Sequence, residues 1–120
     1  MTTVQEAADK TGLTGHTLRY YERIGLIWDV ERDPSGHRRY TESQVGWLVM
    51  LTRLRATGLP IAGMRRYADL VRSGRGEAER VELLRRHRTA VVARMAELTA
   101  DLAVIDGKIE SYERALGKSA

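Results

Sequence analysis

The spacing of apolar positions divides the first part of this chain into two short helices. Thr3 and Glu6 have the spacing of a capping box and predict the start of one helix, which Gly12 can end in the left-handed conformation. Thr14 is a good N-cap for a second helix that runs to about Arg23. Two short helices joined by a tight, glycine-containing turn are typical of a helix-turn-helix.

A small hairpin is predicted next, over residues 26–40. Its arms are residues 26–28 and 37–40, and the segment between them contains Pro34 and Gly36, which favour a turn. We interpret this hairpin as the wing of a winged helix.

Helical spacing returns after the hairpin. Thr41 and Gln44 form a second capping box, and apolar residues recur at helical intervals until Gly58. Pro60 presets the backbone near the start of a further helix. A short flexible break at residues 73–76 separates this part from the rest of the chain.

From there the pattern predicts a coiled coil. Apolar positions spaced alternately by three and four residues continue over five heptads, interrupted by Arg88. A helix with so narrow an apolar stripe cannot bury it alone and needs a partner helix, most simply a second copy. The expected dimerisation residues are Val81, Leu84, Val91, Met95, Leu98, Leu102, Ile105, Ile109, Tyr112 and Leu116.

Charge along the predicted coil favours an antiparallel pair. Residues 80–95 hold five Arg and one Glu, whereas residues 96–113 hold five acidic residues and one Lys. An antiparallel homodimer would place Arg85 beside Glu113 of the second copy, although Lys108 would then face His87. Each exposed pair contributes only about 0–1 kcal/mol, so the charges select an orientation more than they stabilise the dimer.

Composition narrows the possible functions. The chain has 120 residues, a net charge of +4, no Cys and three His that are far apart, which argues against disulfides, thiolate chemistry and a zinc site. We expect no metal and no cofactor. We also expect no enzymatic activity, because we find neither a glycine-rich phosphate loop nor a nucleophile with a plausible base. No apolar run reaches the roughly 20 residues of a membrane span, and no signal peptide is recognised, so we expect a cytoplasmic protein.

The net positive charge lies in residues 1–75, the part of the chain that contains the predicted helix-turn-helix and hairpin. Residues 1–75 carry 12 Lys/Arg and 8 Asp/Glu, whereas residues 76–120 carry 8 of each. In a helix-turn-helix, groups on the second helix reach bases and phosphates, so His16, Arg19 and Arg23 are candidate DNA contacts. Leu18 and either Tyr20 or Tyr21 should face the core. A merely solvated basic face would give the same pattern of charges.

The hairpin and the fourth helix add further cations. Arg38 and Arg39 are adjacent, so strand alternation should point them to opposite faces and leave at least one free to meet DNA. Arg65, Arg66 and Tyr67 form a second basic-aromatic cluster that would clamp the DNA backbone if it lies on the DNA side.

Three segments together resemble the N-terminal signature of the MerR family of transcription regulators: TLRYYE at residues 17–22, GLI at 25–27 and GHRRY at 36–40. The resemblance extends to the order of elements along almost the whole chain. Residues 54–60 and 66–70 resemble the aldehyde-responsive branch, but the sensing Cys of that branch would align near Arg53, so its mechanism is absent here.

The resemblance implies a homodimer that binds a pseudo-palindromic promoter operator, distorts the spacer DNA and acts with RNA polymerase there. A small-molecule effector, if there is one, is not identified by any residue. The implied and candidate DNA contacts are Thr14, His16, Thr17, Arg19, Tyr20, Tyr21, Arg38, Arg39, Tyr40, Arg65 and Tyr67.

The sequence therefore predicts a mainly α protein: a winged helix-turn-helix DNA-binding domain followed by a long dimerisation helix in an antiparallel coiled coil. The expected boundaries are residues 1–75 for the DNA-binding domain with a second wing, 76–116 for the coil and 117–120 for a short tail. Two alternatives stay open, an excisionase-like architectural DNA-binding factor and a coiled-coil adaptor whose basic face is incidental.

Overall fold

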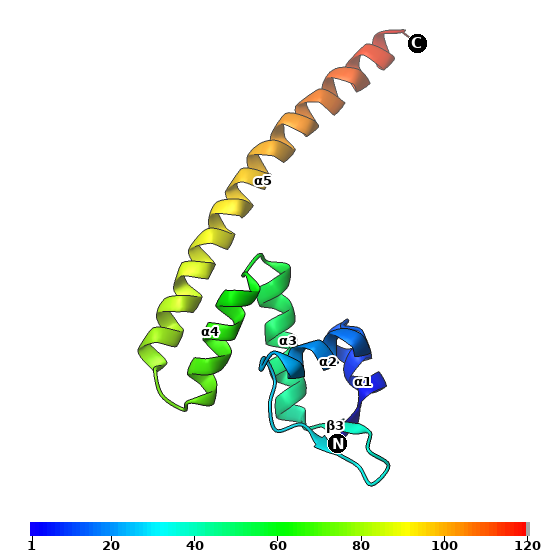
Figure 1. Cartoon of the computed structure of the whole chain (residues 1–120). Coiled ribbons are helices and arrows are strands. Elements are labelled where there is room, and N and C mark those ends of the chain that lie inside the picture. Colours follow the sequence, from blue (N-terminus) through cyan, green and yellow to red (C-terminus); the bar gives the residue numbers. More distant parts are fainter. Residues whose placement is uncertain (120) are drawn as a thin grey trace. The chain divides into compact units, whose positions relative to one another are not determined.

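The computed structural model describes residues 1–119 as two compact units (Figure 1). The first unit is Met1–Leu83, and the second begins at Leu84. The first unit contains three short strands, four helices and the first residues of a fifth helix, and the second is the remainder of that helix. The boundary expected at residue 75 between the DNA-binding domain and the coil stays a prediction.

The predicted helix-turn-helix is confirmed as α1 (Val4–Thr11) and α2 (Gly15–Arg23). Thr3 and Glu6 form the capping box of α1, and Gly12 ends it with φ of 75°. The Thr14 hydroxyl caps α2 by accepting a hydrogen bond from the backbone N–H of Thr17. Leu18 of α2 is buried, so the helix turns one face into the core and leaves its basic face outside.

The wing belongs to a three-stranded antiparallel sheet with the order β1-β3-β2. Its strands are β1 (Thr2–Thr3), β2 (Glu31–Arg32) and β3 (Arg38–Tyr40). The first strand was not predicted. Thr2 pairs with Tyr40 and Glu31 pairs with Arg39, so β3 joins the start of the chain to the wing.

The first arm of the hairpin was predicted wrongly at residues 26–28. Gly25, with φ of 82°, ends α2 and turns the chain inward, and the N–H of Leu26 bonds the carbonyl of Tyr21. Leu26 and Ile27 are then buried in the core instead of pairing in the sheet. A short apolar run does not by itself distinguish a strand from a core-facing turn.

Helices α3 (Glu42–Ala56) and α4 (Ile61–Arg72) complete the first unit. The predicted capping box of Thr41 and Gln44 is confirmed, and Pro60 stands at the N-cap of α4 without a side-chain capping bond. Both helices contribute to the core with apolar residues at helical spacing. The buried members of this set are Val45, Leu48, Leu51, Leu54, Met64, Ala68 and Leu70.

Helix α5 (Glu77–Ser119) is continuous and covers the whole predicted coil. Its apolar stripe is exposed in the single chain, with Met95 61% and Leu98 57% exposed. The expected tail at 117–120 is still helical to Ser119, and residue 120 lies outside the described residues. Among residues 1–119, no helix has the length and apolarity needed to cross a membrane.

Candidate nucleic-acid interface

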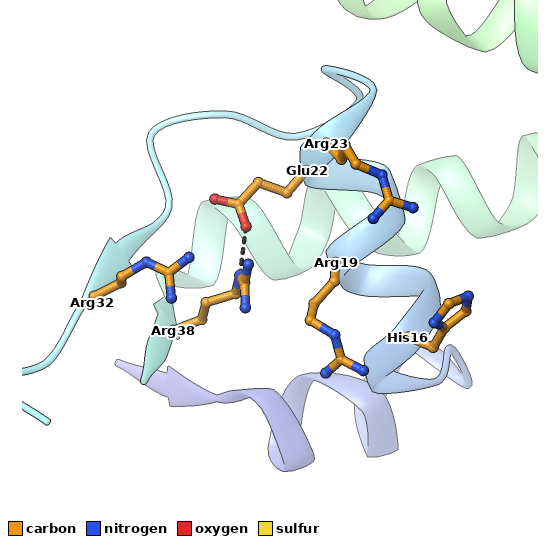
Figure 2. Close-up of a pocket in the computed structure, with 6 residues that line it drawn as sticks. All are labelled: His16, Arg19, Glu22, Arg23, Arg32 and Arg38. Carbon is orange, nitrogen blue, oxygen red and sulfur yellow. Dashed lines mark hydrogen bonds and ion pairs between the residues drawn. The ribbon is translucent and has the colours of Figure 1, made fainter. Parts of the chain in front are cut away.

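A basic cleft lies between α2 and the wing. It has a volume of about 260 Å³ and is lined by four arginines with one histidine and one carboxylate, which we call the arginine cleft (Figure 2). Its residues are His16, Arg19, Glu22, Arg23, Arg32 and Arg38. In Figure 2, His16, Arg19 and Arg23 project from α2, while Arg32 and Arg38 come from the two wing strands on the other side.

One ion pair joins the two sides of the arginine cleft. The Nε of Arg38 lies 2.5 Å from Oε1 of Glu22, and both side chains are roughly three-quarters buried. The pair fixes the wing against the helix that carries His16 and Arg19. A charged hydrogen bond of this kind is stronger than a neutral one and adds geometric definition.

The tip of the wing is held by Asp33. Its Oδ1 accepts hydrogen bonds from the backbone N–H groups of Ser35 and His37, at 2.9 and 3.0 Å. Its Oδ2 lies 2.8 Å from the Nη2 of Arg39. The backbone N–H bond from His37, and secondarily Arg39, hold the pKa of the Asp33 carboxyl below its ordinary value of 3.8.

We predict that Asp33→Asn loosens the wing tip and abolishes the change that the wing tip undergoes when the Asp33 carboxyl is protonated at acid pH. Because the pKa of Asp33 is lowered in the folded protein, its carboxylate stabilises the wing above pH 3.8, and this contribution is lost as the pH falls through the lower folded pKa. The chemical shifts of the Ser35 and His37 amides should follow that titration in the wild type and not in the variant. Glu31→Gln, which removes the same charge elsewhere in the wing, should leave the titration intact. A titration that persists in Asp33→Asn would contradict this account.

The expectation that at least one of the two adjacent wing arginines is free to meet DNA stays a prediction, because both form ion pairs within the first unit. Arg38 pairs with Glu22 and Arg39 pairs with Asp33. Each of these ion pairs uses only one nitrogen of a guanidinium that has five N–H donors, so both side chains can still bind a phosphate. The cations of the wing are therefore preorganised by carboxylates.

The tyrosines divide into two kinds. Tyr21 and Tyr40 are 4% and 0% exposed, and burial raises the pKa of both phenols. Both were expected to contact DNA, but buried rings serve the core, and we leave them out of the interface. Tyr20 is half-buried and carries the Arg23 guanidinium 5.5 Å from its ring centroid, so it supports a cation at the edge of the cleft.

The hydroxyls of Thr14 and Thr17, at the start of α2, make hydrogen bonds within the chain. The Thr14 hydroxyl donates to the Thr17 hydroxyl at 3.0 Å while it caps the helix. Their expected DNA contacts therefore stay predictions, with the hydroxyls already committed to the cap.

Only part of the second basic-aromatic cluster, which lies on α4, is available for contact with DNA. Arg65 is exposed and has no ion pair among residues 1–119. Arg66 pairs with Glu79 at 2.6 Å, and the ring of Tyr67 stacks on Trp47 with centroids 5.3 Å apart. Of the expected pair, Arg65 is thus the side chain placed to reach a phosphate.

Sequence reasoning missed Arg32 and Glu22 as members of the site. Arg32 is opposite Arg38 in the register of β2 and β3, so a correct strand assignment would have found it. Glu22 pairs with a residue 16 positions away, and no local pattern signals that contact. Within residues 1–119, no cluster of His, Asp and Glu could hold a metal ion.

Comparison with known proteins decides the family. The family model described as "MerR HTH family regulatory protein" matches residues 2–70, and a second, "MerR, DNA binding", matches residues 45–114. The chain belongs to the MerR family. It is a MerR-type transcription regulator, and the excisionase-like and adaptor alternatives are set aside.

Similar MerR-type proteins come from several bacteria. An uncharacterized HTH-type transcriptional regulator of Haemophilus influenzae is 33% identical over 114 residues, covering 94% of this chain and 84% of that protein. The structure of HiNmlR, a MerR family regulator lacking the sensor domain, bound to promoter DNA, is 32% identical with a TM-score of 0.84, covering 95% of this chain and 91% of that one. A MerR family regulator from Listeria monocytogenes is 34% identical with a TM-score of 0.83, covering 94% and 86%.

Proposed function

We propose that this MerR-type regulator binds a pseudo-palindromic promoter operator as a homodimer and distorts the spacer DNA to control transcription. The observation that carries the proposal is the arginine cleft, where cations from α2 and from the wing face the same concave surface. Such a surface can meet base edges through α2 and the adjacent phosphates through the wing. The solved promoter complex of HiNmlR supports the same use of the fold.

The homodimer is supported by α5. Ten apolar or Tyr residues form a heptad stripe that the single chain leaves exposed or half-exposed. The opposite charges of residues 80–95 and 96–113 favour an antiparallel arrangement of two copies. We propose that two arginine clefts, held by this rod, engage one duplex together, and that the bound dimer acts on RNA polymerase at the same promoter.

The proposed function requires that the protein bind DNA, and it requires no chemical reaction on the DNA. We therefore propose a non-enzymatic, cytoplasmic regulator without a resident cofactor. Specificity should come partly from the free energy needed to deform the spacer DNA, because that free energy depends on the sequence of the spacer.

Arg19→Ala tests whether α2 reads the operator. We expect affinity for an operator fragment, selected from a random DNA pool, to fall by about 1–3 kcal/mol. If Arg19 contacts a base, the variant should also lose preference at one operator position. If it contacts a phosphate, the slope of log affinity against log salt should decrease by about one unit.

Arg114→Ala is the matched control, because it removes the same charge at an outer heptad position of α5. It should leave both affinity and salt slope unchanged. Equal operator affinity of Arg19→Ala and the wild type at every salt concentration would contradict the assignment of α2 as the reader.

A further inference from the structure

The loop between α2 and the wing is held by three side chains from α3 and α4. Gln44 donates to the carbonyls of Trp28 and Asp29, at 3.0 and 3.1 Å. The indole N–H of Trp47 donates to Leu26 O at 2.6 Å, and Arg72 donates to Gly25 O at 2.8 Å. The path from the proposed reading helix to the wing is therefore set by these contacts.

A cavity of about 280 Å³ lies beside this loop, and we call it the aromatic cavity. Its lining is mostly apolar and aromatic, with a polar edge: Ile27, Trp28, Asp29, Ser43, Gln44, Trp47 and Val71. The two indoles, which are the only tryptophans of the chain, meet edge to face with centroids 5.7 Å apart. Both indoles are partly exposed, although the Arg72 guanidinium already lies over the ring of Trp28 and the ring of Tyr67 stacks on Trp47.

The polar edge of the aromatic cavity is anionic. Asp29 is exposed, has φ of 55°, and makes no ion pair among residues 1–119. Trp28 already accepts a guanidinium, because Cζ of Arg72 lies 4.9 Å from its ring centroid. Electron-rich ring faces and an unpaired carboxylate both attract a cation and disfavour an anion.

We propose that the aromatic cavity binds a small planar organic cation, an aromatic amidinium or guanidinium, which packs against Trp28 and Trp47 and pairs with Asp29. A bound ligand would touch Trp28, Asp29, Gln44 and Trp47, the same residues that fix the loop. Binding there would therefore act on the contacts that set the path of the loop from α2 to the wing. This consequence rests on the proposed function, whereas the binding itself does not.

Benzamidinium titrated into the full-length protein without DNA tests the proposal, with tryptophan fluorescence as the readout, because both tryptophans line the cavity. We expect saturable quenching by benzamidinium, at least about threefold weaker binding of its neutral isostere benzamide, and none by benzoate. Asp29→Asn should weaken benzamidinium about threefold to fivefold, the range of an exposed ion pair. Asn tolerates positive φ, so the loop should keep its conformation.

Glu31→Gln is the matched control, since Glu31 is a nearby exposed carboxylate outside the cavity. It should bind benzamidinium as the wild type does. Equal binding of benzamidinium and benzamide, or unchanged affinity in Asp29→Asn, would overturn the proposal of a cation site. Tryptophans shielded from acrylamide at dimer-forming concentrations would also overturn it, because a second copy would then fill the cavity.

Discussion

Replacing Leu98 with aspartate is expected to separate the dimer and to lower operator affinity by about 10²- to 10⁴-fold, the factor that linking two binding modules provides. Leu98 is 57% exposed in the single chain and belongs to the apolar stripe of α5. In the proposed antiparallel dimer Arg85 of one copy lies beside Glu113 of the other, so the two-fold axis lies midway, near Thr99, and would bring the two new carboxylates together. Burying two unpaired charges at that axis costs far more free energy than the remaining apolar contacts of the coiled coil can offset.

The measurement combines sedimentation equilibrium with operator binding. Leu98→Asp should sediment as a monomer whose first unit keeps its fold, because residues 1–83 have their own core. Ala100→Asp is the matched control, since it places the same charge two residues away on the outer side of the helix. A Leu98→Asp protein that stays dimeric with unchanged operator affinity would rule out the α5 stripe as the interface.

The second large effect is expected for Arg38→Glu. The variant removes a cation from the arginine cleft, turns its ion pair with Glu22 into a repulsion, and adds a negative charge that would face DNA. We expect operator affinity to fall about 100-fold, equivalent to about 3 kcal/mol. Electrophoretic mobility shift at fixed salt would measure the change.

A charge swap separates the two roles of Arg38. The double variant Glu22→Arg with Arg38→Glu restores an ion pair between α2 and the wing and keeps the net charge. We expect it to recover the melting temperature of the wild type but only part of its operator affinity, because the cation now projects from α2. Wild-type affinity in the single variant Arg38→Glu would contradict any role of the wing in binding.

The sequence predicted the helices of the first unit well because their ends are chemically marked. The capping boxes at Thr3 and Thr41 and the left-handed glycine at Gly12 act within one turn of the helix, so a local pattern is sufficient to find them. The stripe of α5 is equally local, since its period is repeated over many turns. The turn residues Pro34 and Gly36 marked the wing in the same local way, and the family signature agreed with its place after α2.

What the sequence could not predict depends on contacts between distant residues. The strand Thr2–Thr3 is too short to show alternation and exists only because β3 pairs with it. The pairing of Glu22 with Arg38 and the burial of Tyr21 rather than Tyr20 require the packed unit. The same holds for the aromatic cavity, whose lining comes from the loop, α3 and α4.

The pairing of Thr2 with Tyr40 also orders events during synthesis. Helices as short as α1 and α2 are marginal alone, and α1 packs on α3 as well as on α2, so their packing also depends on residues made later. The sheet must wait until β3 has emerged, and only then can the first residues of the protein find their partner. A nascent chain thus completes the packing around α1, and its sheet, only after the residues of α3 and β3 have been made.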